Sequence, residues 1–127
     1  MQQVSKIISG GQTGVDRAAL DVALKLDIPC GGWVPAGRIA EDGLVDDCYP
    51  LQETPSSKYT QRTSWNVRDS DGTLILSWGE LTGGTAKTYL IATQLPRPCY
   101  VVDLSLEPDT SFVQEWLALH AITTLNI

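Results

Sequence analysis

Two glycine-rich segments carry the clearest chemical signal in the sequence, and each follows an apolar stretch typical of a strand. The first is Gly10-Gly11-Gln12-Thr13-Gly14 and the second is Gly83-Gly84-Thr85. Glycine permits a tight turn and lets a ligand approach the backbone closely. The first N–H groups of a helix have no partner inside the helix and can bind an anion. We therefore expect both segments to be strand-to-helix turns that bind a phosphate-bearing ligand.

The two segments match neither of the standard nucleotide-binding fingerprints. They contain no Gly-x-Gly-x-x-Gly pattern and no Walker sequence ending in Gly-Lys-Ser/Thr. A tight connection without a ligand is the alternative for each turn. Two such turns in one chain favour binding, because the carboxyl ends of parallel strands share one sheet edge, where open α/β folds bind ligands.

Side chains beside the two turns could add to such a site. Thr13 offers a hydroxyl group, and Arg17 offers a charge one turn into the helix that follows. Thr85 and Thr88 offer hydroxyl groups beside the second turn, although Thr85 could instead cap its helix. Lys87 is either a ligand cation or a solvated surface lysine.

A long segment between the two turns, residues 31–57, is rich in Gly, Pro, Asp and Glu and has little periodicity. We expect a long ordered loop, and loops of this length in compact domains are often functional. Its Arg38 could pair with a phosphate or a carboxylate, and Trp33 could stack on a planar ligand or pack in the core. On the next predicted helix, Arg62 and Asn66 share one face, which points either into the cleft or into solvent.

Candidates for catalysis are weaker. Glu41, Asp42 and Glu80 could act as acid or base, but acids in loops are more often turn formers or solvated charges. A Ser/His/Asp or Cys/His set would need His120, the one histidine, which is far from both turns in sequence. No cluster with the spacing of metal ligands is visible.

The order of the elements predicts the fold class. We expect strands at 4–9, near Cys30, and at 73–78, 99–104 and 124–127, and helices at 15–26, 58–70, 85–95 and 111–121. This alternation predicts one Rossmann-like domain over residues 1–127, with three α/β/α layers. The sheet is expected to be mostly parallel, with about five strands and helices on both faces.

The amino-acid composition argues against several classes of function, as the charge, the apolar runs and the cysteines each indicate. The net charge of −6 would repel nucleic-acid phosphates, so we do not expect a nucleic acid as partner. No apolar run approaches the roughly 20 residues that span a bilayer, so we expect no membrane association and a cytoplasmic location. The three cysteines, Cys30, Cys48 and Cys99, form no Cys-x-x-Cys pair and suggest neither disulfides nor a zinc site.

These motifs, in this order, resemble a known family. The stretch 9–21 with the first glycine turn, the loop 32–43, the strand start 70–75 and the turn 81–85 are together similar to the "putative molybdenum carrier" family. That family belongs to a Rossmann-like group called lysine-decarboxylase-like, which includes the molybdenum-cofactor carrier protein and the cytokinin-activating phosphoribohydrolases. Its members are circularly permuted relative to those proteins.

The resemblance implies a nucleotide or a molybdenum-cofactor-type pterin phosphate as the ligand, and a homo-oligomer, either a dimer or a tetramer. One feature departs from the wider group, and a second departs from the family itself. The phosphoribohydrolases carry a catalytic glutamate in the helix after the second turn, where this chain has Ala86-Lys87-Thr88. The family also continues beyond its last strand, so we expect the chain to be truncated at Ile127.

The leading hypothesis is therefore a binding or carrier protein for a phosphate-bearing small molecule. The alternative is a phosphoribohydrolase-like enzyme that cleaves a nucleoside monophosphate.

Overall fold

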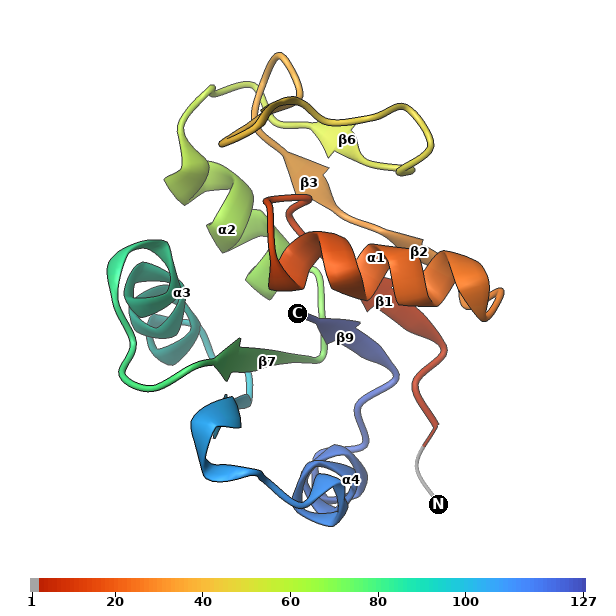
Figure 1. The fold of residues 1–127 in the computed structure, drawn as a ribbon, viewed down its shortest axis with the longest axis vertical. Helices are drawn as coiled ribbons and strands as arrows, with labels where there is room; N and C mark the ends of the chain where they lie inside the picture. The colour runs from red at the N-terminus through yellow and green to blue at the C-terminus, as the bar shows by residue number, and fades with distance from the viewer. Residues whose placement is uncertain (1–2) are drawn as a thin grey trace.

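The computed structural model describes residues 3–127 and shows the predicted α/β architecture (Figure 1). Its α-helices are α1 (Val15–Lys25), α2 (Tyr59–Arg68), α3 (Gly83–Gln94) and α4 (Thr110–Leu119), and η1 (Leu104–Leu106) is a 3-10 helix. Its strands are β1 (Lys6–Ile8), β2 (Cys30–Gly31), β3 (Trp33–Val34), β4 (Ile39–Ala40), β5 (Gly43–Leu44), β6 (Gln52–Glu53), β7 (Gly72–Ser77), β8 (Cys99–Asp103) and β9 (Thr124–Asn126).

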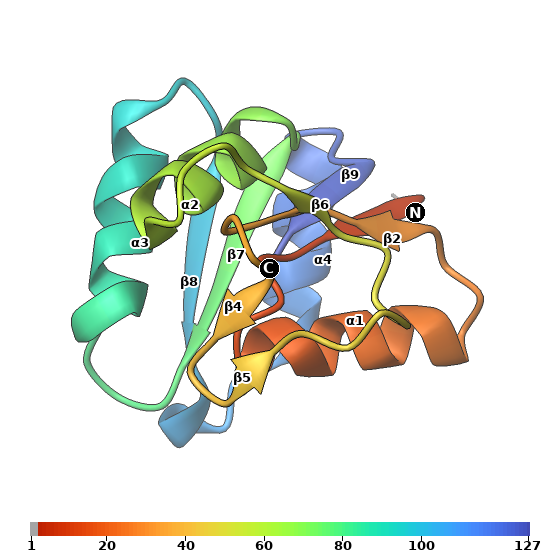
Figure 2. The same cartoon turned by 90° about the horizontal axis from the view of Figure 1, so that it is seen from above.

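The central sheet has five strands in the order β2-β1-β9-β7-β8, and every neighbouring pair is parallel. Because parallel strands are joined by right-handed crossovers, α1 and α4 cover one face of the sheet, and α2 and α3 cover the other (Figure 2). Helix α1 follows β1 and α3 follows β7. Both helices therefore begin at the same edge of the sheet, but on opposite faces.

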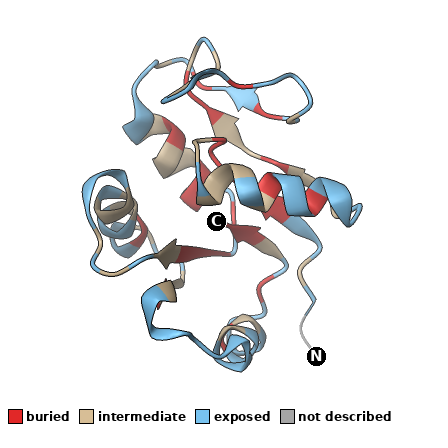
Figure 3. Cartoon of the chain, viewed as in Figure 1, coloured by how far each residue is buried: buried red, intermediate tan, exposed pale blue. Residues whose placement is uncertain are grey.

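The main core lies between the sheet and the α1/α4 layer. Ile7 and Leu74 of the sheet pack with Ala23 of α1, Trp116 of α4 and Ile122. Figure 3 shows this concentration of buried residues along β1, β7 and β9. These contacts fix the strands whose carboxyl ends carry the predicted turns.

A second, smaller core holds the long segment 31–57 against α1. Leu20 of α1 packs with Val34, Val45 and Leu51 of that segment. The prediction of an ordered loop is correct in outline, but the segment also contains two small sheets. Strands β3 and β6 pair in parallel, and β4 and β5 form an antiparallel hairpin.

Helix α3 starts earlier than expected. Gly83 and Gly84 form its first turn, whereas the sequence pattern placed them in the preceding loop. Gly83 has a φ of 53°, in the left-handed region that favours glycine, so the chain enters α3 through a turn that other residues rarely adopt. No helix among residues 3–127 combines the length and the apolar character needed to cross a membrane.

Candidate ligand-binding cleft

A cleft of about 440 Å³ opens between α3, α2 and the sheet, beside the start of α1. Its lining brings together many of the residues predicted from the sequence, namely Gln12, Thr13, Glu41, Arg62, Gly84, Thr85, Lys87 and Thr88. A smaller hollow of about 60 Å³ shares Arg62 and Thr88 with the cleft and adds Gly10 and Asn66. The first turn reaches the cleft through Gln12 and Thr13, and the second reaches it through Gly84 and Thr85.

Helix α3 presents a polar stripe to this cleft at its N-terminal end. Gly84, Thr85, Lys87, Thr88 and Ile91 line the cleft, at the spacing of one helix face. The Thr88 hydroxyl donates to the Gly84 carbonyl at 3.0 Å, so its proton is already used. Among the hydrogen bonds of residues 3–127, none involves the Thr85 hydroxyl, which remains available to a ligand.

The helices that begin beside the cleft have no side-chain caps. The N-cap residues are Gly14 for α1 and Thr82 for α3, and neither makes a side-chain hydrogen bond to its helix. Helix α4 begins elsewhere and is capped by Asp109, whose carboxylate accepts from Ser111 N–H at 2.9 Å. Uncapped N–H groups at a helix start are the donors that an anion can occupy.

Two arginine side chains donate hydrogen bonds to backbone carbonyl groups of the first glycine turn. Arg62 Nη1 donates to the Gly10 carbonyl at 2.8 Å, and Arg17 Nη2 donates to the Gly11 carbonyl at 3.0 Å. A Cβ atom on Gly10 would lie 2.6 Å from Arg62 Nη1, so a larger residue at this position would displace the guanidinium. The turn is therefore built into the fold through its carbonyl groups.

The β4–β5 hairpin places acidic side chains over the start of α1. The Thr13 hydroxyl donates to Glu41 at 3.3 Å, and the Glu41 N–H donates to Gln12 Oε1 at 2.8 Å. Arg17 and Asp42 form an ion pair, and this hydrogen bond lowers the pKa of the Asp42 carboxyl. Glu41 thus faces the cleft, whereas Asp42 and Arg17 bind each other outside it.

Two other predicted residues, Arg38 and Trp33, contact other parts of the protein instead of the cleft. The Arg38 guanidinium donates to four backbone carbonyl groups of its own loop, those of Val45, Asp46, Tyr49 and Leu51. Trp33 Nε1 donates to Asp69 at 2.8 Å, and its ring meets Trp65 edge to face. Neither Trp33 nor Arg38 lines the cleft.

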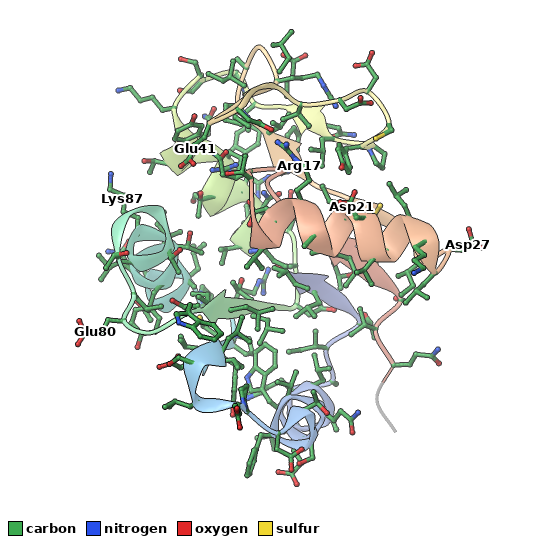
Figure 4. All side chains as sticks on the ribbon, in the orientation of Figure 1. Arg17, Asp21, Asp27, Glu41, Glu80 and Lys87 are labelled. Carbon is green, nitrogen blue, oxygen red and sulfur yellow. The ribbon has the colours of Figure 1, made fainter. Side chains whose placement is uncertain are left out.

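The remaining two candidates lie on different elements. Asn66 donates to the Trp33 carbonyl at 3.1 Å and accepts from the Trp33 N–H at 2.7 Å, which fastens α2 to β3. Glu80 lies in the loop before α3, and Figure 4 shows it well apart from Glu41 and Arg17. The structure therefore does not bring Glu41 and Glu80 together.

Asp16 is the cleft residue that the sequence pattern understated, since an acid in the first turn of a helix is ordinarily explained by the helix dipole. It lines the cleft and accepts the Gln12 N–H at 3.3 Å. Burial raises its pKa to about 6, against the opposing effect of Arg62, the Gln12 N–H and Arg17. A carboxyl group with a raised pKa beside a cleft is typical of a functional site.

Arg62 faces the same cleft from α2. It is 8% exposed, and burial lowers its pKa. The ion pairs of residues 3–127 involve Arg17, Arg38 and Arg68 as cations, so Arg62 and Asp16 do not form one with each other. The cleft therefore contains both a buried cation and a half-buried carboxyl group.

Comparisons with known proteins agree with this fold. Residues 7–127 match the profile of the circularly permutated YpsA SLOG family. The crystal structure of a protein named putative molybdenum carrier protein, from Syntrophus aciditrophicus SB, has 53% sequence identity and a TM-score of 0.95. That alignment covers 99% of this chain and 82% of the other chain. A search of curated proteins gave no match. The chain belongs to the circularly permutated YpsA SLOG family.

Proposed function

We propose that this protein binds a phosphate-bearing small molecule in the cleft, as a carrier or binding protein. The ligand is a nucleotide or a molybdopterin-type cofactor. The observation that carries the proposal is the start of α3, where an uncapped helix N-terminus, an available Thr85 hydroxyl and Lys87 face one cleft. The positive end of the helix dipole adds to these donors.

The charges around the cleft favour α3 over α1 as the phosphate end. At α1, the Glu41 carboxylate already accepts from Thr13, and Asp16 accepts from the Gln12 N–H. A phosphate group there would meet two acids. At α3, the charged residue of the helix that lines the cleft is Lys87. Lys87 takes part in none of the ion pairs of residues 3–127.

The size of the cleft and the relative agree with this proposal. Small-molecule sites usually span roughly 300–1,000 Å³, and this cleft is about 440 Å³. The similar protein from Syntrophus aciditrophicus SB is named putative molybdenum carrier protein. A carrier of that kind needs a site that holds its cargo, and we assign that role to the cleft.

The substitution Gly84→Asp tests the proposed phosphate end. A Cβ atom at Gly84 meets nothing within 4 Å, so the fold accommodates the change. Aspartate in the first turn stabilises a helix by about 0.3–1 kcal/mol, so the free protein should melt slightly higher. The new carboxylate would repel an anion, so the thermal protection given by inorganic phosphate, molybdate or nucleoside monophosphates should be lost.

Ser111→Asp is the matched control, because Ser111 is the second residue of α4 as Gly84 is the second residue of α3. The control adds the same charge at an equivalent helix position outside the cleft. It should keep the full protection. Equal protection of both variants by these anions would rule out α3 as the phosphate end.

The alternative, an N-glycosidic hydrolase acting on nucleoside monophosphates, is favoured by one observation. Glu41 lines the same cleft, so a carboxylate lies beside the proposed ligand. Incubation with nucleoside 5′-monophosphates should then release free base, and Glu41→Gln should abolish the release. Absence of free base would leave binding as the function.

A further inference from the structure

Asp16 holds a carboxyl group in the cleft without an ion-pair partner. The residue is half-buried and lines both the cleft and the smaller hollow beside it. Its carboxylate accepts the Gln12 N–H at 3.3 Å, but the ion pairs of residues 3–127 do not include it. Burial removes part of the hydration of a carboxylate, so the charged form of Asp16 is disfavoured in this position.

The charges around Asp16 come from its own helix and from the other elements that form the cleft. Arg62 of α2, which is 8% exposed, favours the charged form of Asp16 electrostatically. Arg17 of α1 acts in the same direction but is paired with Asp42. Burial outweighs both arginines, so the pKa of Asp16 is raised to about 6. Strand β7 lines the cleft with uncharged side chains, and the remaining ionisable side chains of the lining are Glu41 of the β4–β5 hairpin, Tyr59 of α2 and Lys87 of α3.

An anion in this cleft would favour the protonated form of Asp16 further. The cleft has a volume of about 440 Å³, so an anion at the start of α3 shares one small cavity with the carboxyl group. Two like charges in such a cavity repel each other, because the protein around them screens the interaction less than water does. The protonated carboxyl group avoids this repulsion, so an anion binds more tightly to the protein in which Asp16 is protonated.

We propose that binding of an anion in the cleft takes up a proton at Asp16, so that the protein binds its ligand at mildly acidic pH and releases it at alkaline pH. This inference rests on the proposed function above and adds a means of release to it. The proton comes from the solvent on binding and returns to the solvent on release. Asp16 has a higher pKa in the bound protein than in the free protein, so the affinity falls as the pH rises above about 6.

Sulfate is the probe for this inference, because it stays a dianion over the whole pH range, whereas phosphate titrates within it. Calorimetric titration should show the native protein binding sulfate about three- to tenfold more tightly at about pH 5 than at about pH 8. At about pH 6.5, titrations in two buffers with different enthalpies of ionisation should show uptake of a fraction of a proton for each sulfate bound. Equal affinities at both pH values, or the absence of proton uptake, would overturn the inference.

The variant Asp16→Asn should bring the ratio of the two affinities close to one, since asparagine has the size of the protonated carboxyl group and cannot ionise. It should bind sulfate at about pH 8 nearly as tightly as the native protein does at about pH 5. Asp27→Asn makes the same chemical change at the far end of α1 (Figure 4) and should keep the native ratio. A native ratio in Asp16→Asn would contradict the assignment of the proton to Asp16.

Glu41→Gln removes the exposed carboxylate that lines the same cleft. It should strengthen sulfate binding at both pH values and keep their ratio, because the Asp16 carboxyl group is unchanged. A ratio close to one in Glu41→Gln would assign the proton to Glu41 and overturn the inference.

A measurement on the native protein makes the test independent of any variant. The pH titration of the Asp16 carboxyl carbon, followed by NMR at constant ionic strength, should give a higher pKa with saturating sulfate than with chloride. An Asp16 pKa that is the same in both salts would contradict the proposal.

The outcomes separate this inference from the proposed function. If sulfate binds with equal affinity at both pH values, the proton uptake at Asp16 fails and the anion site stands. If neither sulfate nor phosphate binds at either pH, both fail.

Discussion

The Asp16 side chain contributes to stability in a way that depends on pH. Its pKa is raised to about 6 in the folded protein, from an ordinary value of 3.8, because burial disfavours the charged form more than Arg62 and Arg17 favour it. The folded state therefore binds the proton more tightly than the unfolded state. It follows that the free energy of unfolding falls as the pH rises through the interval between these two values.

Replacing Asp16 with asparagine should remove this penalty. The shift corresponds to as much as about 3 kcal/mol at a pH where the carboxyl is ionised. We expect Asp16→Asn to raise the free energy of unfolding at about pH 8 and to have little effect near pH 4, where the native carboxyl is already protonated. Urea denaturation at both pH values measures the difference.

Asp27→Asn provides the comparison for that experiment, since Asp27 is an exposed acid at the end of α1. It should change the stability by a few tenths of a kcal/mol at either pH, as surface substitutions usually do. A loss of stability for Asp16→Asn at about pH 8 would show that the ionised carboxylate is favourable in the fold, against this interpretation of its burial.

The individual arginines show why residue roles could be predicted only in part. A sequence shows that a guanidinium is present, but its partners come from segments distant along the chain. Arg62 contacts Gly10, 52 positions away along the chain. Of the two predicted orientations, into the cleft or into solvent, its side chain lies in the cleft. The Arg38 donors are taken up by carbonyl groups of its own loop, and no spacing rule indicates that arrangement.

At the level of elements, Arg38 organises the hairpin loop over residues 38–51. Its four carbonyl partners lie within that loop, and the Val45 N–H returns a hydrogen bond to the Arg38 carbonyl at 2.8 Å. This loop carries Glu41 to the mouth of the cleft. The shape of the cleft therefore depends on a side chain that does not line it.

Arg38→Ala should loosen this loop. Four backbone carbonyl groups would lose a charged donor, at a cost of about 2–4 kcal/mol in the free energy of unfolding. Amide hydrogen exchange of residues 39–51 should accelerate by more than about tenfold, while exchange in α4 should follow only the global stability.

Arg97→Ala is a suitable control, because Arg97 is exposed and also donates to a backbone carbonyl, that of Arg68. We expect a loss below about 1 kcal/mol and unchanged exchange in the loop. If Arg38→Ala leaves the exchange of residues 39–51 unaltered, the loop is held by its apolar contacts with α1 and not by the guanidinium.

The regular elements were predictable because each has a strong local signal. Helix α1 has apolar residues at helical spacing, and β7 contains the apolar run Leu74-Ile75-Leu76. The four strands β3 to β6 have two residues each, too few to show any period, and tertiary contacts alone define them. The start of α3 was placed too late because glycines in sequence indicate a turn, whereas Gly83 and Gly84 begin the helix.

At the scale of the whole molecule, strand order determines where the cleft forms. Strand β9 lies between β1 and β7, so the two helices that follow β1 and β7 start on either side of it. Helices α1 and α3 lie on opposite faces, and their N-terminal residues reach the cleft from different directions. The two glycine turns are therefore not equivalent, although the sequence presents them as a pair.

Under the proposed function, the difference between the turns would orient the ligand. One end, at α3, is uncapped and has Lys87 and the Thr85 hydroxyl nearby. At the other end, beside α1, the Glu41 carboxylate accepts the Thr13 hydroxyl. The carbonyl groups of Gly10 and Gly11 there accept hydrogen bonds from Arg62 and Arg17. The net charge of −6 does not prevent anion binding, because the donors at α3 act locally and distant charges are screened.

The most direct test of the phosphate site is an amide NMR titration of the protein with inorganic phosphate and then with a nucleoside monophosphate. A phosphate bound at the start of α3 should produce the largest shift changes at the backbone amides of Gly84 and Thr85. The amide of Ser111 serves as an internal reference, since Asp109 already caps α4 there. Shift changes that are absent at α3, or that are as large at Ser111 as at Gly84, would contradict the proposal.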